Sequence, residues 1–157
     1  SFVLLRLPPL RANTTSRLVK TPKLHFYDTG LAAYLLGIRT DEHLRAHPLR
    51  GAIFETWVVT EIVKSYFNRR RRPTISFYRD RKGTEIDIVV DDGASRLLIE
   101  TKSGAHYDPT HAVAVDRVTL SDGPSELRKI VVYGGDRSYV SNEVEVVSWR
   151  DLATHLT

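Results

Sequence analysis

The sequence predicts an α/β fold from two patterns that follow one another along the chain. Apolar side chains recur every three or four positions over residues 49–68, which indicates a long amphipathic helix. Short apolar runs bounded by Gly, Pro and Asp come after it and are typical of strands. From residue 51 the order is therefore helix, three strands, a connection, two strands and a final helix. A length of 157 residues suits one compact domain with this order.

The segment before the long helix predicts a strand pair. Residues 2–7 form an apolar strand pattern that two prolines stop, and a second such pattern covers residues 18–27. A polar, basic turn at residues 11–17 connects the two. We interpret two strands around a basic turn as the wing that remains of a winged-helix segment.

A short helix is expected between this strand pair and the long helix. Asp28 and Thr29 are good N-cap residues for an apolar helix over residues 31–36, and Gly37 suits its C-terminal end. Because the chain opens directly on a strand pattern with no lead-in, we expect it to be a piece of a longer protein; the alternative is that Ser1 follows a removed initiator residue.

The long helix carries a glutamate on its apolar stripe. Glu55 lies in line with Val59, Ile62 and Tyr66 at helical spacing. A carboxylate on a buried stripe requires a partner, because its desolvation is otherwise costly. That partner is either a metal or catalytic site, or a basic residue such as Lys102 or an arginine elsewhere.

The predicted elements beyond this helix are short and separated by turn residues. Four arginines at residues 69–72 and the proline after them end the helix. Asp91-Asp92-Gly93 is a hairpin signal between two of the strands. The predicted elements are strands at residues 74–79, 83–90, 97–102, 129–133 and 144–148, a short helix or irregular segment at 112–120, and a helix at 149–156.

Composition excludes several classes of protein. Hydrophobic residues make up 41% and charged residues 27%, as in an ordinary globular domain. The sequence contains no apolar run long enough to cross a membrane and no signal-peptide pattern, so we expect no membrane association. Cysteine is absent, which excludes disulfides and cysteine zinc sites and fits a cytoplasmic protein.

Charge is distributed unevenly along the chain. The net charge is +4, but residues 1–50 hold eight Lys and Arg against three Asp and Glu, whereas residues 51–157 hold fifteen against sixteen. The basic excess in the first third suits contact with phosphates or with an acidic neighbouring domain. The alternative is an ordinary solvated surface.

Two neighbouring strand patterns carry charged side chains where a core strand has none. Side chains alternate faces along a strand, so Glu100 and Lys102 point the same way, and Asp87 shares a face with Glu85 and Val89. If the two strands pair as a hairpin, the side chains of Asp87, Glu100 and Lys102 converge. Carboxylates and an ammonium at the end of apolar strands are costly to desolvate without a function.

A divalent metal would account for these charges. Mg²⁺ prefers one or two carboxylates together with water and phosphate oxygens, and a lysine beside it positions the attacking water or assists its deprotonation. Asp87 and Glu100 are therefore candidate metal ligands, with Lys102 beside them. The alternative is a structural ion pair at the edge of the sheet.

An acid on one strand followed by (D/E)-x-K on the next is similar to the signature of the PD-(D/E)xK nuclease superfamily. Five motifs occur in one order: Lys23-Leu-His-Phe-Tyr-Asp28-Thr-Gly30-Leu, Gly51-Ala-Ile-Phe-Glu55, Phe77-Tyr-Arg-Asp80, Gly83-Thr-Glu85-Ile-Asp87 and Glu100-Thr-Lys102-Ser-Gly104. That order resembles the nuclease-like C-terminal domain, of unknown function, found in prokaryotic AAA-type ATP-binding proteins. The resemblance runs from about residue 18 to residue 102, and more loosely to the end of the chain.

The resemblance implies a fold and a division of the chain. The fold would be a restriction-endonuclease-like core, a mixed sheet flanked by helices, with a small winged-helix-like remnant before it. Residues 1–48 would form the remnant and linker, and residues 49–157 the nuclease-like domain. An AAA-type ATPase domain upstream in the same polypeptide would be a partner, and the oligomeric state is left open.

The resemblance also implies a reaction, Mg²⁺- or Mn²⁺-dependent hydrolysis of DNA phosphodiester bonds. Asp87 and Glu100 would hold the metal with the backbone carbonyl of Thr101. Lys102 would orient the water, and Glu55 would complete the acidic cluster from the first helix. The alternative is a non-catalytic DNA-binding or regulatory domain of an AAA-type ATPase, in which these residues form a structural cluster.

Basic residues next to the motif strands are candidates for DNA contact. Arg79, Arg81 and Lys82 surround the turn before Asp87, so we expect them to meet phosphates. The four arginines at residues 69–72 are better explained by the helix C-terminus, whose dipole favours positive charge. The sequence contains no G-x-x-x-x-G-K-[ST] motif, so we expect no Walker-type ATP site within this chain.

Overall fold

The computed structural model describes residues 3–11, 21–120 and 122–156. Most of the predicted basic turn and the predicted start of the second strand lie outside the described residues. No helix among the described residues is both long enough and apolar enough to cross a membrane.

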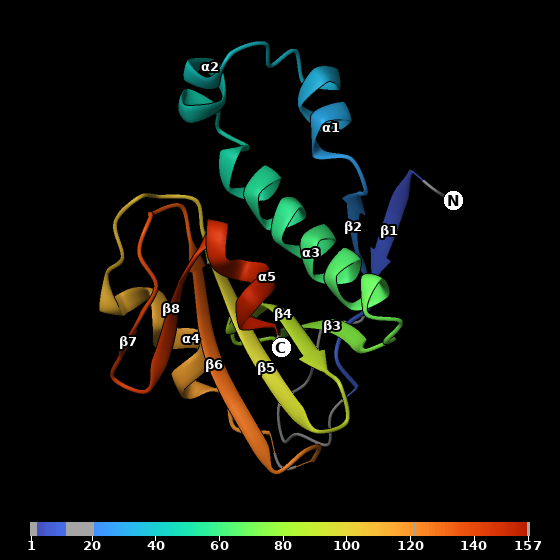
Figure 1. Ribbon diagram of the computed structural model, residues 1–157, viewed down its shortest axis with the longest axis vertical. Coiled ribbons are helices and arrows are strands. Elements are labelled where there is room, and N and C mark those ends of the chain that lie inside the picture. Colours follow the sequence, from blue (N-terminus) through green and yellow to red (C-terminus); the bar gives the residue numbers. More distant parts are fainter. Residues whose placement is uncertain (1–2, 12–20, 121, 157) are drawn as a thin grey trace.

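A six-stranded mixed sheet forms the centre of the structure (Figure 1). The strands lie in the order β3-β4-β5-β6-β8-β7; β3, β4 and β5 are antiparallel, β5, β6 and β8 are parallel, and β7 runs antiparallel to β8. Its members are β3 (Thr74–Arg79), β4 (Glu85–Asp91), β5 (Ser95–Lys102), β6 (Glu126–Tyr133), β7 (Tyr139–Ser141) and β8 (Val144–Ser148). The predicted α/β class, with a mixed sheet flanked by helices, is confirmed.

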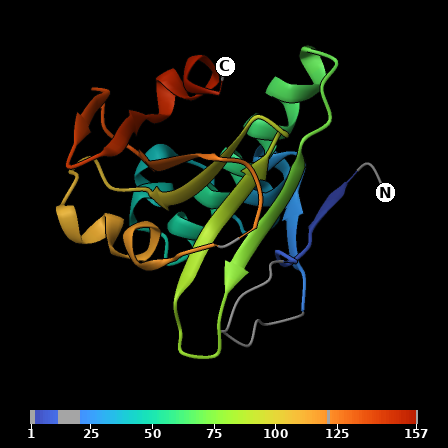
Figure 2. The same ribbon diagram turned by 90° about the horizontal axis from the view of Figure 1, so that it is seen from below.

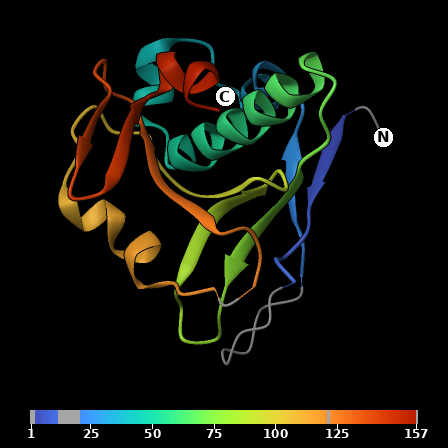
Figure 3. The ribbon, with the colours of Figure 1, turned by 60° about the horizontal axis from the view of Figure 1, so that its bottom comes forward.

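Helices cover both faces of this sheet, as Figure 3 shows. Helices α3 (Arg50–Asn68) and α5 (Leu152–His155) close the first core on one face. The short segment η1 (Pro109–Ala112) and helix α4 (Val113–Arg117) close the second core on the other face. Strand alternation supplies both cores, because Ile99 of β5 packs in the first and Leu98 in the second.

Helix α3 buries the stripe that its spacing predicts. Val59, Ile62 and Tyr66 are fully buried in the first core. Burial of such side chains contributes about 1.5–3 kcal/mol each. Glu55 lies one turn earlier on the same stripe and is carried to the sheet by the packing of its neighbours.

The N-terminal strands pack against the rest of the protein (Figure 2). Strands β1 (Leu4–Leu7) and β2 (Lys23–Phe26) form the predicted antiparallel pair. The chain after β1 then runs beside β3, where the Leu10 amide donates to the Phe77 carbonyl at 2.7 Å. Strand β2 contacts α3. These contacts bring β2 next to Glu55, although the predicted division between residues 48 and 49 stays a prediction.

Helix α2 (Asp41–Ala46) and strand β7, both among the described residues, were not predicted from the sequence. Helices α1 (Thr29–Leu35) and α2 precede α3, and of these two α1 was expected. Helix α2 is short and polar, so it shows no apolar period; the Thr40 hydroxyl caps it by accepting from the His43 amide. Strand β7 has three residues, which is too short to show a pattern of alternating apolar side chains.

A glycine at the end of β6 provides a test of this packing. A Cβ on Gly134 would lie 2.5 Å from the Ser103 carbonyl oxygen, whereas a Cβ on Gly104 would meet nothing within 4 Å. We expect Gly134→Ala to lower the free energy of unfolding by about 1–3 kcal/mol, because backbone has to move. Urea unfolding of the two alanine variants measures this, with Gly104→Ala as the control. Equal stability of the two would contradict the close approach.

Candidate metal and catalytic site

The position of Asp87 depends on a bulge in β4. Ser76 pairs with Val89 and Tyr78 with Ile86, so Asp87 and the residue after it face a single residue of β3. A bulge of this kind re-aims side chains. The prediction that Asp87 and Val89 share a face is therefore wrong: Val89 packs in the second core, whereas Asp87 turns toward α3.

Thr101 of β5 holds the Asp87 carboxylate in place. Oδ2 of Asp87 accepts hydrogen bonds from the Thr101 amide at 2.9 Å and from its hydroxyl at 2.8 Å. For Oδ1, the charge partner within the described ranges is Lys23 Nζ, at a distance of 3.9 Å. The structure thus gives Thr101 a positioning role through its N–H and O–H groups, and the predicted role of its carbonyl as a metal ligand stays a prediction.

Glu100 and Lys102 lie on the opposite face of β5 from Thr101. Glu100 is in register with Val131 of the second core, and alternation puts Lys102 on the same side. Lys102 Nζ forms an ion pair with Glu100 Oε1 at 2.7 Å. The other carboxylate oxygen, Oε2, is buried and has no hydrogen-bond partner among the described residues.

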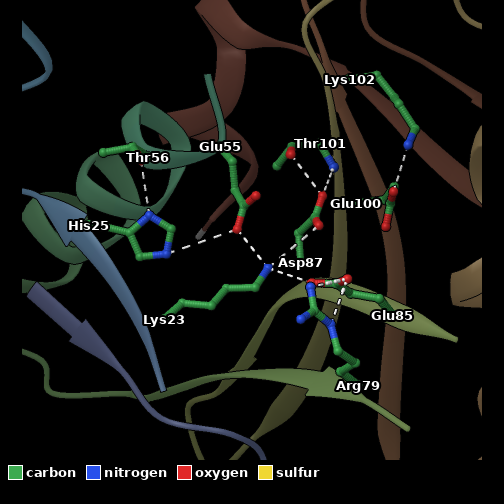
Figure 4. A network of polar contacts seen from close by, with 10 residues as sticks. All are labelled: Lys23, His25, Glu55, Thr56, Arg79, Glu85, Asp87, Glu100, Thr101 and Lys102. Carbon is green, nitrogen blue, oxygen red and sulfur yellow. Dashed lines mark hydrogen bonds and ion pairs between the residues drawn. The ribbon is translucent and has the colours of Figure 1, made fainter. Parts of the chain in front are cut away.

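This environment disfavours the charge on Glu100. Burial and the nearby Asp87 carboxylate raise the pKa of Glu100 to about 7, although Lys102 acts in the opposite direction. A bound cation would relieve both effects. The same Asp87 charge raises the pKa of Glu55, after burial as the largest cause, so Asp87 lies electrostatically between Glu55 and Glu100 (Figure 4).

Glu55 is paired with a lysine that the sequence patterns did not single out. Lys23 Nζ lies 2.8 Å from Glu55 and 2.7 Å from Glu85. Burial lowers the pKa of Lys23, but Glu55, Glu85 and Asp87 together outweigh it and raise the pKa above the ordinary value. The partner of Glu55 is therefore Lys23, and the expected alternatives, Lys102 or an arginine, are not its partners among the described residues.

His25 lies beside this ion pair on the same strand. It is only 5% exposed; its Nδ1 lies 3.0 Å from the Thr56 hydroxyl and its Nε2 lies 3.9 Å from Glu55 Oε1. Nε2 is buried and finds no hydrogen-bond partner in the part of the chain that the structure describes. Burial and the Lys23 charge lower the pKa of His25 to about 4, so the ring is neutral at pH 7.

A signal for Lys23 and His25 exists in the sequence but is misleading by itself. The two residues alternate along β2, which predicts a common face, yet Leu24 and Phe26 would be the natural choice for the inner face. In the structure Leu24 is 65% exposed and His25 is buried. Apolar patterning does not predict that Lys23 and His25 face inward. The sequence feature that singles them out is the motif that begins at Lys23.

Of the three residues predicted to contact DNA, one is paired within the protein and two have exposed side chains. Arg79 is engaged by Glu85 Oε2 through two hydrogen bonds, at 2.9 and 2.6 Å. The side chains of Arg81 and Lys82 are exposed on the turn before β4. Asp80 shapes that turn, since its Oδ1 accepts from the backbone amides of Lys82 and Thr84.

Asp87 and Glu100 carry donors of the kind that a hard divalent cation takes. Asp87 Oδ1 and the unpartnered Glu100 Oε2 are carboxylate oxygens, which Mg²⁺ and Mn²⁺ prefer. Within the described part of the chain, no three His, Cys, Asp or Glu side chains form a ready metal site by themselves. A cation would therefore rely on Asp87 and Glu100 together with backbone, water or phosphate oxygens, as Mg²⁺ commonly does.

Comparison with known families matches two parts of the chain. Residues 50–152 match the family described as a domain of unknown function (DUF4143). Residues 1–42 match a second family described as a domain of unknown function (DUF8612). No curated protein matches the chain. Glu55, Asp87, Glu100 and Lys102 lie in the first match, and Lys23 and His25 in the second.

Proposed function

Because the chain belongs to the DUF4143 family, whose description assigns no activity, its function has to be argued from the site, and we propose that it is a Mg²⁺- or Mn²⁺-dependent nuclease acting on DNA phosphodiester bonds. The observation that carries this proposal is the buried Glu100, with one oxygen paired to Lys102 and the other without a partner. The Asp87 carboxylate beside it is already fixed by Thr101. Such an arrangement is costly unless it binds a cation.

Each side chain has a definite part in the proposed reaction. Asp87 and Glu100 would hold the cation. When bound, Mg²⁺ supplies a Lewis acid that polarises the phosphate and lowers the pKa of a coordinated water. Lys102 orients the water and stabilises charge that develops on the phosphate. The water oxygen forms the new bond to phosphorus, its proton passes to solvent, and the leaving oxygen takes a proton as its bond to phosphorus breaks.

Glu55 has an indirect part in this scheme. Its carboxylate is paired with Lys23 and lies on the far side of Asp87 from Glu100. We propose that Glu55 acts through Lys23 on the charge and position of Asp87. An AAA-type ATPase domain of the same polypeptide is proposed as partner on the strength of the motif order, which resembles such proteins.

A second candidate function is supported by the two lysine ion pairs. Lys23 with Glu55, and Lys102 with Glu100, neutralise carboxylates without a metal. These pairs suit a non-catalytic DNA-binding or regulatory domain. Incubation of supercoiled plasmid with the protein in Mg²⁺ or Mn²⁺ separates the two functions. Metal-dependent nicking supports the nuclease; intact plasmid with both metals, in the presence of the ATPase partner as well, supports the regulatory domain.

DNA binding gives a further expected result, which both functions share. Arg81 and Lys82 are exposed on the turn next to the site, so their replacement by glutamine is expected to flatten the salt dependence of DNA affinity by about two phosphate contacts. Fluorescence anisotropy at several salt concentrations measures the slope. Glutamine at Arg70 and Arg72, at the end of α3, is the control. An equal change from both pairs would mean that the turn has no special contact with DNA.

A further inference from the structure

A lysine from the N-terminal strand pair occupies the centre of an acidic cluster. Lys23 Nζ lies 2.8 Å from Glu55, 2.7 Å from Glu85 and 3.9 Å from Asp87 (Figure 4). Its side chain is 18% exposed, and its ammonium lies 5.2 Å from the centre of the Phe77 ring. Three carboxylates from α3 and β4 thus surround one lysine that comes from β2, and Glu85 is also paired with Arg79 at 2.6 Å.

The groups around this ammonium are those that a divalent cation takes. Three carboxylates surround it, and the buried Nε2 of His25, without a hydrogen-bond partner, lies 3.9 Å from the same Glu55 oxygen that the lysine contacts. Carboxylate oxygens together with a neutral imidazole nitrogen suit Mn²⁺.

This cluster shares Asp87 with the pair of carboxylates assigned to the catalytic metal, but not Glu100. Glu100 and Lys102 lie on the other face of β5, and Asp87 is the residue between the two groups. If Lys23 were absent, Asp87 would belong to two cation sites, as in two-metal nucleases that clamp both reacting oxygens.

We propose that Lys23 is the internal cation of this site: it takes the place of a second divalent ion, neutralises Glu55 and, together with Arg79, Glu85, and leaves Asp87 and Glu100 to bind one metal ion. Lys23 is a positioning residue, since it acts through Asp87. The single metal ion rests on the proposed function, whereas the role of Lys23 as a replacement for a second ion does not.

Counting bound metal tests this directly. Lys23→Met, Lys23→Arg and wild type are titrated with Mn²⁺, and free Mn²⁺ is measured by electron paramagnetic resonance. We expect Lys23→Met to bind one Mn²⁺ more per chain than wild type and Lys23→Arg to bind the wild-type number. Lys129→Met is the matched control, because Lys129 pairs with a single carboxylate, Asp116, at the surface.

The outcomes separate this inference from the proposed function. Equal numbers of Mn²⁺ on Lys23→Met and wild type overturn the inference, whatever that number is. No Mn²⁺ on wild type but one on Lys23→Met overturns the proposed catalytic metal and supports the inference. One on wild type and two on Lys23→Met supports both.

Melting temperatures show whether Lys23→Met is folded, and they provide a second test of the inference. Without metal, Lys23→Met is expected to melt about 5–10 °C below wild type, since Glu55 and Asp87 lose their cation and Glu85 keeps only Arg79, and Mn²⁺ is expected to restore most of the loss. Adding Glu55→Gln to Lys23→Met removes one repelling charge and should raise the melting temperature above that of the single variant. A double variant that melts at or below the single variant would overturn the inference.

Discussion

Replacing any one of Asp87, Glu100 and Lys102 is expected to abolish metal-dependent DNA cleavage. Asp87→Asn, Glu100→Gln and Lys102→Met each keep side-chain size and remove one charge. We expect the cleavage rate to fall by about 10²-fold or more for each, because metal binding and orientation of the water depend on all three. Initial rates of plasmid nicking in Mg²⁺ and in Mn²⁺ measure the loss.

The combined variant shows whether these residues act as one unit. Glu100 and Lys102 are joined by an ion pair of 2.7 Å, so Glu100→Gln with Lys102→Met is expected to be no slower than either change alone. Lys129→Met is the control with full activity. A single variant that keeps more than about a tenth of the wild-type rate would remove that residue from the proposed chemistry.

Glu100→Gln is also expected to stabilise the metal-free protein above neutral pH. Burial and Asp87 raise the pKa of Glu100 from 4.5 to about 7. The folded protein therefore binds more protons than the unfolded chain between these values, and stability falls as pH rises through them. At pH 8 the variant is expected to exceed wild type by about 1–2 kcal/mol, and at pH 4.5 the difference should vanish.

Glu145, whose pKa is lowered rather than raised, provides the control. Glu145 is paired with Arg128 at 2.8 Å, and that hydrogen bond lowers the pKa of Glu145 although burial opposes it. Its contribution to stability is present above the unfolded pKa and is lost as pH falls. Glu145→Gln should therefore destabilise at pH 8. Urea unfolding at both pH values decides, and a Glu100→Gln variant less stable than wild type at pH 8 would show that the Lys102 ion pair dominates.

Local patterns were sufficient for most of the fold. The strand at residues 74–79 and the buried stripe of α3 agree with the structure, because apolar spacing alone determines such elements. Charge on apolar strands, which is costly to bury, was the signal that singled out Asp87, Glu100 and Lys102 as candidates. Their arrangement was not predictable, since the bulge that turns Asp87 toward α3 depends on pairing with β3.

The role of Lys23 could not be predicted from local sequence for a different reason. Its partner Glu55 is 32 residues away, and the contact exists only because β2 packs on α3. A charged residue on a short strand next to Leu24 is ordinarily placed at the surface. Packing of β2 on α3 instead places Lys23 inside, so the cation of the acidic cluster comes from a segment outside the strands β4 and β5.

The central claim is that Asp87 and Glu100 bind one divalent metal ion, and a crystal structure grown in saturating Mn²⁺ tests it most directly. If both residues bind the ion, we expect an anomalous manganese peak about 2.0–2.3 Å from one oxygen of each carboxylate. Lys23 should remain between Glu55 and Glu85 in that structure. No peak at this position, with Lys102 still paired to Glu100 and the Asp87 carboxylate unchanged, would contradict the claim.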